Sequence, residues 1–111
     1  MAADPKVFLL VLNWNRPDDT LECLESCTRL DYPNLEILLI DNQSTDQSVP
    51  MIRSRFPSVS LVVNSENLGY AGGNNVGIQC ALDRGADFVF ILNNDATVFP
   101  DTLSRLIEAA K

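Results

Sequence analysis

Four short hydrophobic runs recur along the chain, at residues 7–12, 35–40, 59–63 and 88–92. Each run is rich in Val, Ile, Leu and Phe, and lacks the strict alternation of apolar and polar positions that is typical of a strand with one solvent-facing side. Nearly continuous apolar runs of this length are typical of strands buried on both faces of a parallel sheet. The pattern therefore predicts four strands of one central sheet.

Hydrophobic residues recur at helical spacing in the segments between these runs. Leu21, Leu24 and Cys27 share one face of the first segment, and we expect Ile78, Ala81 and Leu82 to face inward in the third. The predicted helices cover about residues 17–28, a segment that starts near 46, about residues 70–84, and the residues after 100. Strands and helices that alternate in this way predict an α/β fold, a doubly wound parallel sheet with helices on both faces.

Polar residues follow each predicted strand directly. They read NWNR at 13–16, DNQSTD at 41–46, NSENLG at 64–69 and NND at 93–95. Asn, Asp, Ser and Gly are common turn formers and helix N-caps, so each cluster alone has a purely structural explanation. The turns expected at the opposite edge of the sheet are built differently, around Pro and Gly. Because ligands of open α/β sheets bind beyond the carboxyl ends of the strands, this asymmetry favours a ligand site.

Glycines are dense in the segment NLGYAGGNNVGI, residues 67–78. Three of them fall between Gly69 and Gly73, and Gly77 follows one helical turn later. We expect this density to allow close approach to a ligand. The segment is not a GxGxxG fingerprint and follows the third strand, which argues against an NAD site. Walker A, GxSxG and HExxH patterns are absent, and a chain without His has no Ser-His-Asp triad.

Two carboxylates stand directly after predicted strands. Asp41 could accept a hydrogen bond from a ring N–H or a ribose hydroxyl. Asp95 is flanked by carboxamides, and one carboxylate among neutral neighbours suits Mg²⁺ or Mn²⁺, because these ions draw most ligands from water and phosphate oxygens. The alternative for Asp95 is a solvated turn before Pro100.

Composition narrows the classes of partner. A length of 111 residues with 46% hydrophobic content is that of one globular domain, and the net charge of −7 argues against nucleic acid as a partner. The N-terminus lacks a signal pattern, and no apolar run approaches the ~20 residues that cross a bilayer, so we expect a cytoplasmic location. We expect Cys23, Cys27 and Cys80 to be reduced, because their number is odd and no CxxC pattern or His accompanies them.

Taken together, the strand-end motifs closely resemble the N-terminal half of family 2 glycosyltransferases, nearest to the rhamnosyltransferase-like branch. The segments that carry the resemblance are VLNWNRPDDTLECLES, EILLIDNQSTDQS, NSENLGYAGGNNVGI and FILNNDATVFPDTL. The resemblance covers essentially the whole chain. It implies a truncated GT-A-type nucleotide-binding domain, with residues 1–111 forming the N-terminal, nucleotide-sugar-binding part of a catalytic domain.

The resemblance also implies roles for individual residues. Asp41 would contact the base, Asn93 the ribose, and Asp95 would coordinate the metal. The implied substrate-binding residues are Asn13, Asn15, Arg16, Asp41, Asn67, Gly69, Gly73, Asn74, Asn93 and Asn94. The chain departs from the family at Gly73-Asn74-Asn75, where many members have Ala-Arg-Asn, and at Asn93, where Asp is commoner.

An enzyme of this family would transfer a sugar from a nucleotide-diphosphate sugar, with inversion and with help from Mg²⁺ or Mn²⁺. UDP- or dTDP-sugars are the favoured donors, and a cell-surface polysaccharide or its lipid-linked precursor is the expected acceptor, met at the inner face of the membrane by the full-length protein. The general base is expected after Lys111, since the chain stops inside RLIEAAK. We therefore expect a donor-binding part of a larger protein that is inactive alone.

Two other interpretations compete with this one. A flavodoxin-like or receiver-like binding module would have similar length, but a receiver needs paired acids after its first strand, where this chain has Asn13, and the chain has only Lys6 and Lys111 as lysines. A fragment retained only for assembly would expose apolar surface and form a homo-oligomer.

Overall fold

The computed structural model describes residues 4–110, in which strands and helices alternate. The elements are β1 (Val7–Asn13), α1 (Pro17–Cys27), β2 (Leu35–Asp41), α2 (Ser48–Arg55), β3 (Ser60–Val63), α3 (Gly69–Asp83), β4 (Phe88–Leu92) and α4 (Thr102–Ala110). Every element that the hydrophobic pattern predicts is present, and the ends differ by only a residue or two.

The four strands form one parallel sheet in the order β3-β2-β1-β4. The chain first moves outward from β1 to β2 and β3, then returns to add β4 on the other side of β1. The order of the strands therefore reverses between β1 and β4. In open α/β sheets this reversal opens a crevice at the carboxyl ends of the two strands, and ligands bind there.

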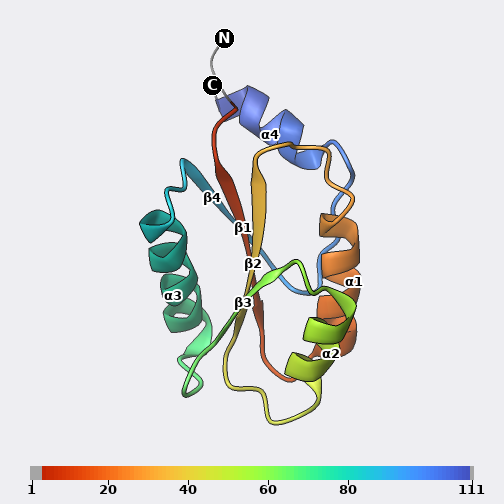
Figure 1. The fold of residues 1–111 in the computed structure, drawn as a ribbon, viewed down its shortest axis with the longest axis vertical. Helices are drawn as coiled ribbons and strands as arrows, with labels where there is room; N and C mark the ends of the chain where they lie inside the picture. The colour runs from red at the N-terminus through yellow and green to blue at the C-terminus, as the bar shows by residue number, and fades with distance from the viewer. Residues whose placement is uncertain (1–3, 111) are drawn as a thin grey trace.

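Helices cover both faces of the sheet, as predicted. Helices α1 and α2 lie on one face, α3 lies on the other, and α4 lies near the amino ends of the strands (Figure 1). Successive side chains of β1 point to opposite faces, so Leu9 and Val11 pack beneath α1 and α2 while Phe8 and Leu10 pack beneath α3. No helix within residues 4–110 combines the length and the apolar character that crossing a bilayer requires.

Helix α3 lies close to the sheet because small residues form its inner stripe. A Cβ atom at Gly77 would lie 3.0 Å from side-chain carbons of both Leu10 and Ile40, and one at Gly73 would lie 2.7 Å from Leu12 Cδ1. The glycine density led us to expect close approach to a ligand. At Gly73 and Gly77 the close approach is instead to side chains of the sheet. The expected helix start in this segment is confirmed, since α3 begins at Gly69 with φ +75°.

The expectation that Leu82 faces inward is wrong. Its side chain is 55% exposed, whereas Ala81 is fully buried. The buried stripe of α3 runs through Gly73, Gly77 and Ala81, at a spacing of four residues, and this register turns Leu82 toward solvent.

Candidate functional site

The carboxyl ends of β1 and β2 meet at a buried pair of polar side chains. Asn13 and Asp41 are opposite each other in the strand register, and Asn13 Nδ2 donates to Asp41 Oδ1 over 2.8 Å. Both side chains are fully buried. They therefore form the floor of the strand-end region.

The loop after β2 is fastened to this floor. Ser44 donates its backbone N–H to Asp41 Oδ2 over 2.8 Å and its hydroxyl to Asp41 Oδ1 over 2.7 Å. A carboxylate can accept about four hydrogen bonds, so Oδ1 is fully used while Oδ2 keeps one acceptor position. Asp41 thus combines a structural role with spare accepting capacity.

Asn15 joins the loops after β1 and β2. Its φ of 51° lies in the left-handed region, which Asn tolerates better than most residues. Its Oδ1 accepts from the backbone of Thr45 over 2.8 Å, and its Nδ2 donates to Thr45 Oγ1 over 3.2 Å. The neighbouring Arg16 is largely exposed, with one long ion pair of 3.9 Å to Asp19, so its guanidinium stands at the rim of the site.

Asn42, which the sequence analysis did not single out, anchors the glycine-rich turn. Its Nδ2 donates to the carbonyl of Gly69 over 2.9 Å, and its Oδ1 accepts from Asn64 Nδ2 over 2.9 Å. Asn67 helps from the exposed side by accepting from the Gly69 N–H over 2.8 Å. The signal that could have identified Asn42 is its position directly after a buried strand, next to Asp41.

The turn after β4 is held by one face of α1. Thr20 accepts from Asn94 Nδ2 over 3.1 Å, the Cys23 thiol donates to the carbonyl of Asn93 over 3.7 Å, and Ser26 Oγ accepts from the Val98 N–H over 3.1 Å. These three helix residues recur every third position and so share a face.

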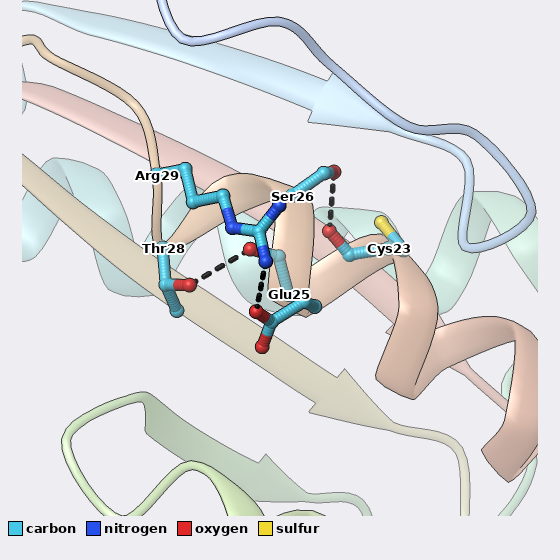
Figure 2. Close-up of polar contacts among 5 residues, drawn as sticks. All are labelled: Cys23, Glu25, Ser26, Thr28 and Arg29. Carbon is cyan, nitrogen blue, oxygen red and sulfur yellow. Dashed lines mark hydrogen bonds and ion pairs between the residues drawn. The ribbon is translucent and has the colours of Figure 1, made fainter.

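Further contacts stiffen the C-terminal turn of this helix. Ser26 also donates to the carbonyl of Cys23 over 2.7 Å, and Thr28 donates to the carbonyl of Glu25 over 2.8 Å (Figure 2). The hydrogen bond with Cys27, followed by burial and by the charges of Cys27 and Asp95, raises the pKa of the Cys23 thiol far above its usual value. All three cysteines are free, as expected.

Asp95 stands at the end of this turn with its side chain exposed to solvent. Within residues 4–110 no hydrogen bond or ion pair engages its carboxylate, and no group of three His, Cys, Asp or Glu side chains could cage a metal. One free carboxylate beside the amide oxygens of Asn93 and Asn94 fits Mg²⁺ or Mn²⁺, which keep several water or phosphate ligands. It would not fit an ion that needs an all-protein cage.

Two adjoining pockets lie at these strand ends. The first, of about 170 Å³, is lined by Leu12, Tyr70, Asn74 and residues 91–95. The second, of about 280 Å³, is lined by Leu12, Trp14, Arg16, Asn42, Asn67, Gly69, Tyr70 and Asn94. The pockets share Leu12, Tyr70 and Asn94, so they adjoin each other in one depressed region beside the β1/β4 crevice.

Asn74 is the unsatisfied group of this depression. Its side chain is only 4% exposed, yet neither Oδ1 nor Nδ2 has a hydrogen-bond partner within the described residues. A buried amide left without partners costs about 1–3 kcal/mol per group. Asn74 lines the first pocket, so this unpaired amide lies next to the space in which a molecule could bind.

The structure therefore brings the expected site residues together at one edge of the sheet, in two layers. Asn13 and Asp41 are buried beneath the site, and Gly73 is buried against Leu12 and Asn42. The residues that line the pockets are Arg16, Asn67, Gly69, Asn74, Asn93, Asn94 and Asp95.

The chain is similar in sequence to known proteins. Residues 9–111 match the family model described as Glycosyl transferase family 2. The succinoglycan biosynthesis protein ExoO of Rhizobium meliloti is 31% identical over 107 residues, covering 96% of this chain and 30% of that protein. The putative glycosyltransferase EpsH of Bacillus subtilis is 30% identical over 109 residues, with the same two coverages.

Solved structures give the same result. The mannosyltransferase PcManGT from Pyrobaculum calidifontis, in complex with GDP-Man and Mn²⁺, superposes with a TM-score of 0.83 at 26% identity, over 96% of this chain and 32% of that one. S. aureus TarS with UDP-GlcNAc gives 0.79 at 25% identity, over 93% and 30%. The fold is thus of the GT-A type, and the chain spans about a third of the length of these relatives.

Proposed function

The chain belongs to glycosyl transferase family 2, and on this premise we propose that residues 1–111 form the nucleotide-sugar-binding part of an enzyme that transfers a sugar from a nucleotide-diphosphate sugar. The observation that carries the proposal is the composition of the first pocket. It combines the unpartnered amide of Asn74 with the free carboxylate of Asp95, at the point where strand order reverses.

The nucleoside is proposed to lie in the second pocket, between the exposed rings of Trp14 and Tyr70. Aromatic side chains stack well on bases, which supports this arrangement. UDP- and dTDP-sugars are the proposed donors, because the remaining acceptor position of Asp41 Oδ2 matches the single ring N–H of uracil or thymine. Asp41 is fully buried, so this contact requires its carboxylate to become accessible when the nucleotide binds. The proposed substrate-binding residues are Asn13, Asn15, Arg16, Asp41, Asn67, Gly69, Gly73, Asn74, Asn93 and Asn94, of which Asn13, Asp41 and Gly73 are buried and support the others from beneath.

Asp95 is proposed to hold Mg²⁺ or Mn²⁺, with water and the donor diphosphate as the other ligands. When bound, such an ion neutralises charge on the leaving diphosphate. The presence of Mn²⁺ and GDP-Man in the PcManGT complex supports this assignment. Asn93 and Asn94 would add neutral oxygen donors and orient the ribose hydroxyls.

The whole enzyme is proposed to carry out one inverting displacement. The bond from the acceptor oxygen to the anomeric carbon forms as the bond to the diphosphate breaks, and the acceptor proton passes to a general base. We assign that base to no residue of this chain. The acceptor is proposed to be a cell-surface polysaccharide or its lipid-linked precursor, met at the inner face of the membrane. The description of ExoO as a succinoglycan biosynthesis protein supports only the polysaccharide class of this proposal.

Calorimetry on the 111-residue chain tests donor binding. UDP, dTDP and GDP, with and without their sugars, are titrated in Mn²⁺ and again in EDTA. We expect binding in Mn²⁺ that is lost in EDTA, and a loss of the metal dependence in Asp95→Asn. The matched control is Asp83→Asn, since Asp83 is an exposed carboxylate at the far end of α3. Binding that is indifferent to EDTA and to Asp95→Asn would contradict the metal assignment, and no binding of any nucleotide would contradict the donor site.

A further inference from the structure

A directional chain of hydrogen bonds runs beneath the two pockets and passes through Thr20. Asn13 Nδ2 donates to Asp41 Oδ1 over 2.8 Å, Thr20 Oγ1 donates to Asn13 Oδ1 over 2.6 Å, and Asn94 Nδ2 donates to Thr20 Oγ1 over 3.1 Å. The chain thus connects the carboxyl ends of β2, β1 and β4 through the first turn of α1. Thr20 is fully buried and lines neither pocket.

The direction of each hydrogen bond follows from the chemistry of its partners. The Asp41 carboxylate accepts, so the amide nitrogen of Asn13 must face it and the amide oxygen must face Thr20. Thr20 has one hydroxyl proton, and it donates this proton in the hydrogen bond to Asn13 Oδ1. The hydroxyl can therefore only accept from Asn94, and Asn94 must turn its nitrogen inward. Its Oδ1 is left on the side away from Thr20.

Asn94 is the residue where this orientation matters, because it lines both pockets. Asn94 shares the first pocket with Asp95, and free rotation of its amide would offer either a donor or an acceptor to a ligand there. The hydrogen bond to Thr20 engages the donor, Asn94 Nδ2, so the acceptor Oδ1 is left for a ligand. An amide oxygen beside a carboxylate favours hydroxyl groups and divalent cations over other acceptors.

We infer that Thr20 is a positioning residue of the donor site, whose hydroxyl couples the Asp41–Asn13 floor to the turn after β4 and holds Asn94 Oδ1 available to the ligand. The ligand part of this inference rests on the proposed function, whereas the orientation of Asn94 does not. Helix α1 is well suited to the task, since Cys23 and Ser26 hold the same turn from the same face.

The test replaces the hydroxyl while keeping the shape of the side chain. Thr20→Val removes both hydrogen bonds and Thr20→Ser keeps them. Thr28→Val is the control, because among residues 4–110 the Thr28 hydroxyl hydrogen-bonds only to the carbonyl of Glu25 on α1. Calorimetry with UDP and with GDP in Mn²⁺ should show binding weakened about 5- to 30-fold in Thr20→Val. Thr20→Ser and Thr28→Val should bind like the wild type.

A double-mutant cycle separates positioning from general destabilisation. If Thr20 acts through Asn94, Thr20→Val should add no further loss in an Asn94→Ala background. Additive losses in the double variant, or unchanged binding in Thr20→Val, would overturn the inference.

NMR decides the orientation without any nucleotide. In the wild type, the side-chain amide protons of Asn94 should show a nuclear Overhauser effect to Thr20. The resonances of these Asn94 protons should shift in Thr20→Val and stay unchanged in Thr28→Val. If the wild type binds neither UDP nor GDP, the donor proposal fails and these spectra still decide the role of Thr20. Absence of the Asn94–Thr20 effect in the wild type would overturn the inference, even if Thr20→Val does not fold.

Discussion

Asp41 shows how one side chain can organise a strand end. Its two oxygens accept from Asn13 and from both the backbone and the hydroxyl of Ser44, and no part of the side chain is exposed. Buried polar groups are stable only while their partners are present. The carboxylate therefore determines the course of the loop after β2 as well as the orientation of the Asn13 side chain.

Replacing Asp41 by Ala should affect folding and binding together. The free energy of unfolding should fall by about 1–3 kcal/mol, because the donors on Asn13 and Ser44 lose their acceptor while buried. Nucleotide affinity should weaken by a further ~1.5–3 kcal/mol, because the proposed hydrogen bond between the carboxylate and the base is lost. Urea denaturation and calorimetry measure the two effects, with Asp83→Ala as the exposed control. An unchanged denaturation midpoint would contradict the structural role, and equal affinity would exclude the base contact.

At the scale of elements, the inner stripe of α3 fixes the distance between this helix and the sheet. A Cβ at Gly73 would lie 2.7 Å from Leu12 Cδ1 and 2.8 Å from Asn42 Nδ2, and real Cβ atoms do not approach other atoms so closely. Since Asn42 in turn holds Gly69, the packing of α3 and the geometry of the glycine-rich turn depend on each other.

Gly73→Val should therefore destabilise the fold by about 1–3 kcal/mol, the usual cost of overpacking. Ala71→Val is the matched control, because Ala71 is exposed on the same helix and should lose only ~0.5 kcal/mol of helix propensity. Thermal unfolding followed by circular dichroism compares the two variants. Equal losses of stability in both would show that Gly73 does not set the packing of α3.

The sequence was sufficient to predict the elements but not every residue of the site. Runs of apolar residues predict the buried parallel strands, and helical spacing predicts the helices, because both patterns are local. Thr20 and Asn42 were missed because their roles depend on which strands are neighbours and on where each side chain points. A Thr at the start of a helix has no local signal of a contact with Asn94, 74 positions further along the chain.

At the scale of the whole molecule, charge limits how the chain can hold its proposed ligand. Fifteen acidic and eight basic residues give a net charge of −7, and a nucleoside diphosphate is itself an anion. Long-range electrostatics therefore oppose binding, and Arg16 is the one basic side chain that lines the pockets within residues 4–110. A divalent cation at Asp95 would offset this repulsion, which is a physical reason to expect metal dependence.

A map of amide chemical shifts decides whether the carboxyl ends of the strands bind a nucleotide donor. The ¹⁵N-labelled chain is titrated with UDP, then with GDP, in Mg²⁺. We expect shifts confined to residues 13–16, 41–46, 67–74 and 93–95, with the opposite edge of the sheet around residues 31–34 and 84–87 unchanged. Shifts centred on that opposite edge, or no shifts at millimolar nucleotide, would show that the carboxyl ends of the strands do not bind the nucleotide.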